Sequence, residues 1–121
     1  MQTKVLAVDD SRTMRDILSH ALGEAGFKVD VAEDGEHGLE VATRFKPDVI
    51  ISDINMPKLD GFGFIKKLRA SGDMRHVPIL VLTTESAPEL KARAREAGAT
   101  GWIVKPFDGE KLVSATRRVS A

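Results

Sequence analysis

Five short apolar segments alternate with five segments of helical character along the chain of 121 residues, and this alternation is the strongest constraint on its fold. Each apolar segment is rich in Val and Ile, which is typical of strands. A chain built from repeated strand and helix predicts an α/β domain with a parallel sheet. The expected strands are 4–8, 28–32, 49–52, 79–82 and 101–104, and the expected helices are 11–25, 35–45, 61–71, 89–97 and 109–119.

The expected strands differ in hydrophobic pattern, and this difference predicts their order. Segments 5–8, 49–51 and 79–82 are continuously apolar, as expected for parallel strands that helices cover on both faces. Segment 28–32 alternates polar with apolar residues, and segment 101–104 is short and begins with glycine, so both are expected at the edges. Right-handed crossovers then give a doubly wound five-stranded parallel sheet of order 2-1-3-4-5, in a flavodoxin-like three-layer sandwich.

The composition excludes several classes of protein. Eighteen Lys and Arg balance eighteen Asp and Glu, and aromatic residues are few, so neither nucleic acid nor an anionic membrane is an expected partner. No segment approaches the roughly twenty apolar residues that a membrane span requires. Cysteine is absent, which excludes disulfides and thiolate sites and favours a reducing cytoplasm. We therefore expect one cytoplasmic, monomeric domain over residues 1–121, with no attached effector domain because the fifth helix ends the chain.

Acidic residues follow the first and third expected strands. Asp9 and Asp10 come directly after the first strand, and Asp53 comes directly after the third. The predicted topology brings these carboxylates together, where two charges about 4 Å apart repel by roughly 4 kcal/mol at an effective dielectric of 20 unless a cation joins them. Oxygen ligands favour a hard ion such as Mg²⁺, to which the backbone carbonyl of Asn55 could add a further ligand. The alternative for Asp10 is that it only caps the first helix.

A hydroxyl and an amine arrive at the same edge from the last two strands. Thr83 directly follows the fourth expected strand, and Lys105 directly follows the fifth. Alone, such a Thr is usually a cap and such a Lys is usually solvated. Beside a metal ion and three carboxylates, they are the groups that a transferred phosphoryl group needs. Asp53 would then be the nucleophile, whose carboxylate attacks phosphorus to form an acyl phosphate.

Four segments resemble the receiver domains of two-component response regulators, and among these the stand-alone chemotaxis type (CheY-like). Each segment is a weak signal alone, whereas all four in this order and spacing are highly specific. They are 8–11 (Val-Asp-Asp-Ser), 53–61 (Asp-Ile-Asn-Met-Pro-Lys-Leu-Asp-Gly), 82–84 (Leu-Thr-Thr) and 105–107 (Lys-Pro-Phe).

The resemblance implies a phosphoacceptor switch rather than an enzyme. Asp53 would accept a phosphoryl group from a phosphohistidine on a partner histidine kinase. Mg²⁺ would be held by Asp10, Asp53 and the Asn55 carbonyl, with Asp9 acting mainly through water. Intrinsic autophosphatase activity would later remove the phosphate.

The resemblance also implies roles for residues in and directly after the last two strands. Lys105 would pair with the phosphate, aimed inward by a cis bond to Pro106, and Thr83 would turn its hydroxyl toward it. Trp102 stands where the family usually has a switch Tyr, Phe or His that moves inward. Because indole is larger, both an inward swing and a static Trp102 that lines the partner surface stay open.

The output surface is expected on the last two helices and the last strand. Segment 89–97 has few apolar positions at helical spacing, so this helix is expected to be loosely held and able to shift between states. The helix, strand 101–104 and helix 109–119 would form the partner face, with a flagellar motor switch protein as one candidate partner. Asn55 and Glu85 resemble the combination in members that lose phosphate quickly, and Thr84 could narrow access to it.

Other functions compete with chemotaxis. Within the family, the chain could be a phosphate sink or a phosphorelay shuttle. From another class, a small phosphatase with an aspartyl-phosphate intermediate usually has its nucleophile after the first strand and a second Asp two residues on, whereas Asp9 and Asp10 are adjacent. A flavin carrier would need a Ser/Thr/Gly-rich phosphate loop after that strand, where the two aspartates would repel the flavin phosphate.

Overall fold

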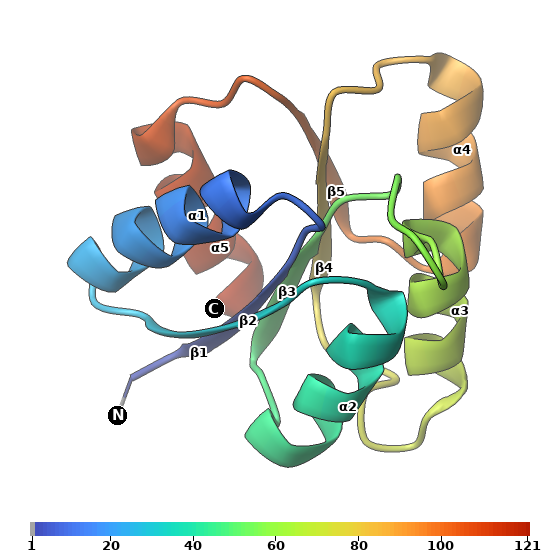
Figure 1. The fold of residues 1–121 in the computed structure, drawn as a ribbon, viewed down its shortest axis with the longest axis horizontal. Coiled ribbons are helices and arrows are strands. Elements are labelled where there is room, and N and C mark those ends of the chain that lie inside the picture. The colour runs from blue at the N-terminus through green and yellow to red at the C-terminus, as the bar shows by residue number, and fades with distance from the viewer. Residues whose placement is uncertain (1) are drawn as a thin grey trace.

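The computed structural model describes residues 2–121 and shows strands and helices that alternate along the chain (Figure 1). The strands are β1 (Lys4–Val8), β2 (Lys28–Ala32), β3 (Val49–Ser52), β4 (Ile79–Thr83) and β5 (Gly101–Val104). The helices are α1 (Arg12–Glu24), α2 (Gly35–Phe45), α3 (Gly61–Ala70), α4 (Pro88–Ala97) and α5 (Gly109–Ser120). Every boundary lies within one residue of its predicted position. Two shifts have simple reasons: Thr83 still pairs with β5 and so ends β4, and proline is favoured in the first turn, where α4 begins.

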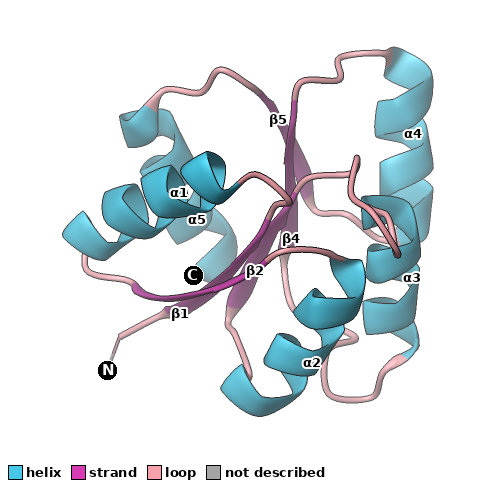
Figure 2. Cartoon of the chain, viewed as in Figure 1, coloured by secondary structure: helices cyan, strands magenta, loops and turns pink. Residues whose placement is uncertain are grey.

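The strands form one parallel sheet in the order β2-β1-β3-β4-β5, as predicted. Strands β1, β3 and β4 are almost entirely buried, whereas β2 and β5 at the edges are partly exposed. Helices α1 and α5 cover one face, and α2, α3 and α4 cover the other, which confirms the three-layer sandwich (Figures 1 and 2). Within residues 2–121, no helix is long and apolar enough to cross a membrane.

Helix α1 is capped at its start, is followed by a glycine with positive φ, and buries a narrow apolar stripe. The Ser11 hydroxyl accepts a backbone N–H of the first turn at 3.2 Å, and Gly26 follows the helix with a φ of 95°. Ile17, Leu18 and Leu22 belong to one apolar repeat at three-four spacing, but only Leu18 and Leu22 are buried, whereas Ile17 is 45% exposed. Ile17 lies about 100° around the helix axis from Leu18, so it points away from the stripe that meets the sheet.

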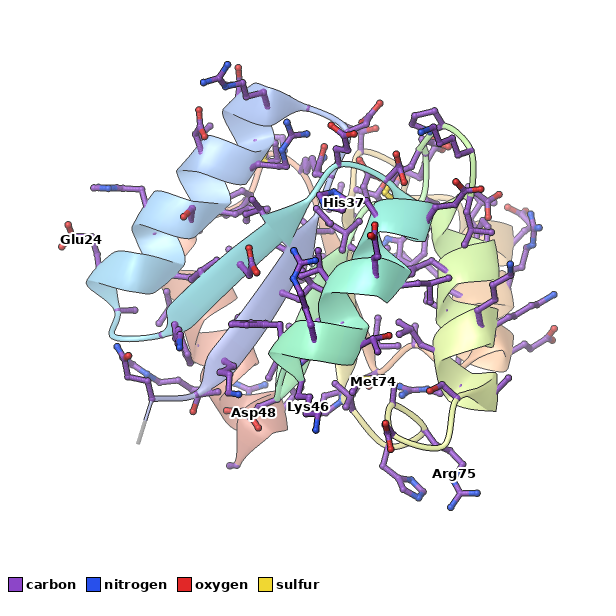
Figure 3. The ribbon with its side chains drawn as sticks, turned by 60° about the horizontal axis from the view of Figure 1, so that its bottom comes forward. Glu24, His37, Lys46, Asp48, Met74 and Arg75 are labelled. Carbon is purple, nitrogen blue, oxygen red and sulfur yellow. The ribbon has the colours of Figure 1, made fainter. Side chains whose placement is uncertain are left out.

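Arg69 joins α3 to two loops at the amino-terminal edge of the sheet. Its guanidinium donates hydrogen bonds to the carbonyls of Gly98 at 3.0 and 2.8 Å, Met74 at 3.1 Å, Arg75 at 3.2 Å and Val77 at 2.6 Å. Met74 and Arg75 lie in the loop between α3 and β4 (Figure 3). Burial lowers the pKa of Arg69, but guanidinium groups stay charged in proteins. The C-terminal end of α4 is therefore attached to α3 through main-chain groups.

We expect Arg69→Met to lower the free energy of unfolding by about 3 kcal/mol, because a charged donor of several hydrogen bonds is lost while most of its acceptors stay partly buried. Urea unfolding followed by circular dichroism measures the change. Arg95→Met, on the exposed side of α4, is the matched control and should change stability by less than about 0.5 kcal/mol. Equal losses in the two variants would contradict this role of Arg69.

The parallel arrangement brings the loops after β1, β3, β4 and β5 to a single edge of the sheet (Figure 2). In open α/β sheets, ligands bind at this carboxyl edge where the strand order reverses, which here is between β1 and β3. Asp9, Asp10, Asp53 and Lys105 follow these same strands, and Thr83 is the last residue of β4.

Candidate functional site

Asp53 leaves the sheet at the end of β3 with its carboxylate held in one orientation. It follows a completely buried strand and is itself 8% exposed. Its Oδ1 accepts hydrogen bonds from the backbone N–H groups of Ile54 at 2.6 Å and Asn55 at 3.3 Å. Its Oδ2 accepts from the Lys105 ammonium at 2.9 Å. Main-chain groups thus orient one carboxylate oxygen, and the other faces a cationic side chain.

The start of α3 lies directly against this carboxylate residue. A Cβ at Gly61 would be 2.5 Å from the Asp53 carbonyl oxygen and 2.6 Å from the Ile54 Cα, so only glycine fits there. The Gly61 N–H donates to the Ile54 carbonyl at 2.9 Å, and Asp60 caps the helix by accepting from Gly63 N–H at 2.9 Å. These contacts set the path of the loop beside Asp53.

Lys105 directly follows β5 and bridges two carboxylates. Its Nζ lies 2.8 Å from Asp9 Oδ2 and 2.9 Å from Asp53 Oδ2, and the side chains of Lys105, Asp9 and Asp53 are only 11%, 2% and 11% exposed. Burial alone would lower the pKa of Lys105, but its hydrogen bonds to Asp53 and Asp9 and the charges of both raise the pKa above its ordinary value. The amine is therefore charged at neutral pH. The Lys105–Pro106 peptide bond is cis, as the resemblance implies.

Asp10 completes a group of three carboxylates. One oxygen from each of Asp9, Asp10 and Asp53 lies within 4.8 Å of the others, and Asp10 is exposed whereas the other two are buried. Lys105 already compensates part of the repulsion expected from the sequence, but three carboxylates against one ammonium keep an excess of negative charge. All of these ligands are oxygens, which suit a hard divalent cation such as Mg²⁺ that retains waters. The residues present therefore fit such an ion.

Glu85 connects three other residues that the sequence singled out. Its N–H donates to the Thr83 hydroxyl at 3.4 Å, its carbonyl accepts from the Trp102 indole at 3.0 Å, and its carboxylate accepts from the Asn55 amide at 3.4 Å. Thr83 is completely buried, Trp102 is half-buried, and Thr84 is exposed. The sequence linked Glu85 only to dephosphorylation. The sequence gives no signal that Glu85 contacts Thr83 and Trp102 through its backbone, because every residue has a carbonyl and nearly every residue has an N–H.

Asn55 belongs to both groups of residues. Its backbone N–H contacts Asp53, and its side-chain amide contacts Glu85. The acidic cluster with Lys105 and the group around Glu85 therefore adjoin at the carboxyl edge, so a change at one can reach the other through direct contacts.

Comparison with known sequences identifies relatives over nearly the whole length. Residues 5–117 match the model of the response regulator receiver domain. The probable chemotaxis protein CheY of Rhizobium etli is 40% identical over 117 residues, which cover 96% of this chain and 91% of that protein. Response regulator MprA of Mycobacterium leprae is 39% identical over 114 residues, which cover 94% of this chain but only 49% of MprA. The chain thus spans about half the length of its MprA relatives.

Solved structures agree with the sequence relatives. Chemotaxis protein CheY4 of Vibrio cholerae has a TM-score of 0.95 and 48% identity, with 98% of this chain and 99% of that chain covered. The receiver domain of sensor histidine kinase PA1611 from Pseudomonas aeruginosa has a TM-score of 0.91 and 27% identity, covers 99% of this chain and 98% of its own, and holds a magnesium ion coordinated in its active site cleft. Sequence and fold lead to the same relatives, and the chain belongs to the CheY-like receiver domains of two-component response regulators.

Proposed function

We propose that Asp53 accepts a phosphoryl group from a phosphohistidine of a histidine kinase in the cytoplasm, and that the phosphorylated chain then binds an output protein in chemotaxis. Receiver domains take phosphate from histidine kinases and act as phosphoacceptor switches that bind output partners. The observation that carries the proposal is the bridge of Lys105 to Asp9 and Asp53 at 2.8 and 2.9 Å, beside the exposed Asp10.

The hydrogen bonds of Asp53 indicate which oxygen reacts. Oδ1 accepts from two backbone N–H groups, whereas within residues 2–121 Oδ2 accepts only from the Lys105 ammonium, so we assign the attack on phosphorus to Oδ2. The new P–O bond forms as the P–N bond to the donor histidine breaks, and the imidazole leaves with the electron pair. Lys105 is placed to neutralise a phosphoryl oxygen as Oδ2 becomes an ester oxygen.

The residues that would hold a divalent cation are Asp9, Asp10, Asp53 and the backbone carbonyl of Asn55. When bound, the ion would supply positive charge to the phosphoryl oxygens. Asp10 is the exposed member of the group, so the site is open to a donor from solvent. The carboxylates themselves would lose mutual repulsion on binding the ion.

Incubation with acetyl phosphate and MgCl₂ tests this function. We expect one phosphoryl group per chain by intact-mass spectrometry, stable in acid and labile in base, as an acyl phosphate should be. Peptide mapping should locate it on Asp53. Steady hydrolysis of unrelated phosphate esters without an accumulating adduct would instead favour the phosphatase and overturn the proposal.

The phosphorylated form should be short-lived. Asn55 and Glu85 contact each other at 3.4 Å beside Asp53, and Thr84 is exposed next to them, so the surroundings of the phosphoryl group are polar and open to water. After removal of acetyl phosphate in the presence of MgCl₂, we expect the adduct to disappear within minutes. A lifetime of many hours would contradict rapid autophosphatase activity.

Output is proposed through the face formed by α4, β5 and α5. Helix α4 buries only Ala94 and Ala97, and the N-cap position before it makes no side-chain hydrogen bond. A groove of about 610 Å³ runs along β5 and α5, where Trp102 contributes to the lining and Val104 is 37% exposed. Movement of the Thr83 hydroxyl toward a phosphoryl group would free the Glu85 N–H and so alter the loop that holds the indole. Trp102 is the sole tryptophan, so its fluorescence reports whether it swings inward or stays in place.

The relatives named as chemotaxis proteins support output in chemotaxis, for which we propose a flagellar motor switch protein as the partner. A phosphate sink or a phosphorelay shuttle is the second candidate. A pull-down that compares phosphorylated protein with Asp53→Asn separates them. Retention of a motor protein only by the phosphorylated form supports chemotaxis. Retention of a phosphotransfer protein without a motor component supports the sink or shuttle.

A further inference from the structure

Arg15 holds the main chain of the acidic cluster. It is the fourth residue of α1, is half-buried, and donates from Nη1 to the Asp9 carbonyl at 2.8 Å. Side chains on a helix lean toward its N-terminus, which lets Arg15 reach back to the end of β1. Asp9 is 1% exposed, and its carbonyl lies beyond the strand pairing, so it needs a donor from within the protein.

The hydrogen bond from Arg15 to the Asp9 carbonyl also fixes the position of the Asp10 backbone. The carbonyl of Asp9 and the N–H of Asp10 belong to one planar peptide unit, so fixing one fixes the other. Two further hydrogen bonds hold Asp9: its N–H donates to the Ala32 carbonyl at 3.1 Å, and its Oδ1 accepts from the Ser11 N–H at 2.9 Å. Asp10 is exposed and, among residues 2–121, forms no ion pair. The orientation of its carboxylate therefore depends on the peptide unit that precedes it.

We propose that Arg15 is a positioning residue for the divalent cation site: by holding the Asp9–Asp10 peptide, it keeps the Asp10 carboxylate beside Asp9 and Asp53. The inference rests on the proposed function only in taking these carboxylates as the cation ligands. Arg15 touches the cation ligands through the main chain alone, so it acts on the ion through Asp10.

The charge of Arg15 and its hydrogen bond have opposite effects on the affinity for a cation. A substitution can therefore distinguish an electrostatic role from a positioning role. A positive charge near the site repels the ion, so removal of charge alone would tighten binding. Removal of the hydrogen bond frees the Asp9–Asp10 peptide and weakens binding. Arg15→Met removes both, and weaker binding by this variant shows that positioning outweighs repulsion.

The measurement is calorimetric titration of the whole chain with MgCl₂. Arg15→Met should raise the Kd for Mg²⁺ about 10-fold, the size usual for a partner that orients a metal ligand. Arg12→Met, which removes the same charge from an exposed position of the same helix, is the matched control and should leave the Kd unchanged or lower. Arg15→Lys keeps the charge and a donor, and should recover part of the lost affinity.

Phosphorylation by acetyl phosphate gives a second measurement. In Arg15→Met the MgCl₂ concentration for half-maximal rate should rise by the same factor, while the rate at saturating MgCl₂ stays at the wild-type value. A lower rate at saturation with unchanged Mg²⁺ affinity would mean that Arg15 acts elsewhere and would overturn the inference. Melting curves in EDTA verify that each variant is folded.

The outcomes distinguish this inference from the proposed function. If the wild type binds Mg²⁺ and Arg15→Met binds it equally well or more tightly, the positioning role is wrong and the proposed function stands. If the wild type binds no Mg²⁺, the cation site is wrong and the role of Arg15 falls with it.

Discussion

The Asp53→Asn variant should take up no phosphoryl group from acetyl phosphate in the presence of MgCl₂. An amide oxygen lacks the negative charge that makes the carboxylate a nucleophile, so the acyl phosphate does not form. Asparagine keeps an Oδ1 that can accept from the N–H groups of Ile54 and Asn55, so the local structure should persist. Intact-mass spectrometry of both proteins after the same incubation measures the effect.

The control for this loss is another aspartate outside the site. Asp73 is exposed in the loop between α3 and β4, and Asp73→Asn should be phosphorylated to the wild-type extent. An adduct on Asp53→Asn as abundant as that on the wild type would place the acceptor elsewhere. The thermal midpoint of Asp53→Asn in EDTA should shift by only a few degrees, because Lys105 keeps Asp9 as a partner while one repulsive charge is removed.

The Lys105→Met variant should be much less stable than the wild type when no metal ion is present. Lys105 is the cation that pairs with Asp9 and Asp53, and removal of one member of a buried ion pair costs about 3 kcal/mol. In EDTA, the thermal midpoint should therefore fall by roughly 10 °C. MgCl₂ should restore more of the loss in this variant than it adds to the wild type, because the ion would relieve the unpaired carboxylates.

Alkaline pH provides a second measurement of the same interaction. Contacts with Asp53 and Asp9 raise the pKa of Lys105 in the folded state above its unfolded value of about 10.4. The folded state then binds the proton more tightly, so the stabilisation is complete below that pH and is lost as pH rises through the folded-state pKa. The free energy of unfolding of the wild type should fall in this alkaline range. The same loss should be absent in Lys105→Met, which has no amine to titrate at this position.

Lys66→Met is the matched control for these experiments. Lys66 is exposed on α3, so its substitution should change stability in EDTA by less than about 0.5 kcal/mol and leave the alkaline profile unchanged. If Lys105→Met lost the same stability with and without MgCl₂, the role assigned to its charge would be wrong and simple packing would explain the loss.

Much of the fold is visible in local sequence patterns. Continuous apolar runs mark the central strands, and the alternating run at 28–32 marks an edge strand, because each pattern reflects how many faces of the strand are covered. The exposure of Ile17 was not predictable in this way, since the width of the buried stripe of α1 depends on how the helix rests on the sheet. A helical period indicates a face but not how much of it is covered.

The candidate site divides along the same line. The types and spacing of Asp9, Asp10, Asp53 and Lys105 are written in the sequence, and a parallel sheet must bring residues that follow its strands to a common edge. The pairing of Lys105 with two carboxylates before any phosphate arrives depends on distances that no spacing specifies. The sequence therefore indicates which groups come together, and the structure shows that Lys105 forms ion pairs with both Asp9 and Asp53.

The order of residues was enough to establish a doubly wound sheet with an acidic, lysine-containing edge, because hydrophobic period and strand-end chemistry are local properties. The contacts of Arg15, Arg69 and Glu85 became visible only in the folded chain. Arg15 and Arg69 donate hydrogen bonds to backbone carbonyls, and the backbone carbonyl of Glu85 accepts one from Trp102. Every residue carries a backbone carbonyl, so the sequence does not identify which carbonyl takes part in a given hydrogen bond. The path of the main chain in space decides which one comes within reach.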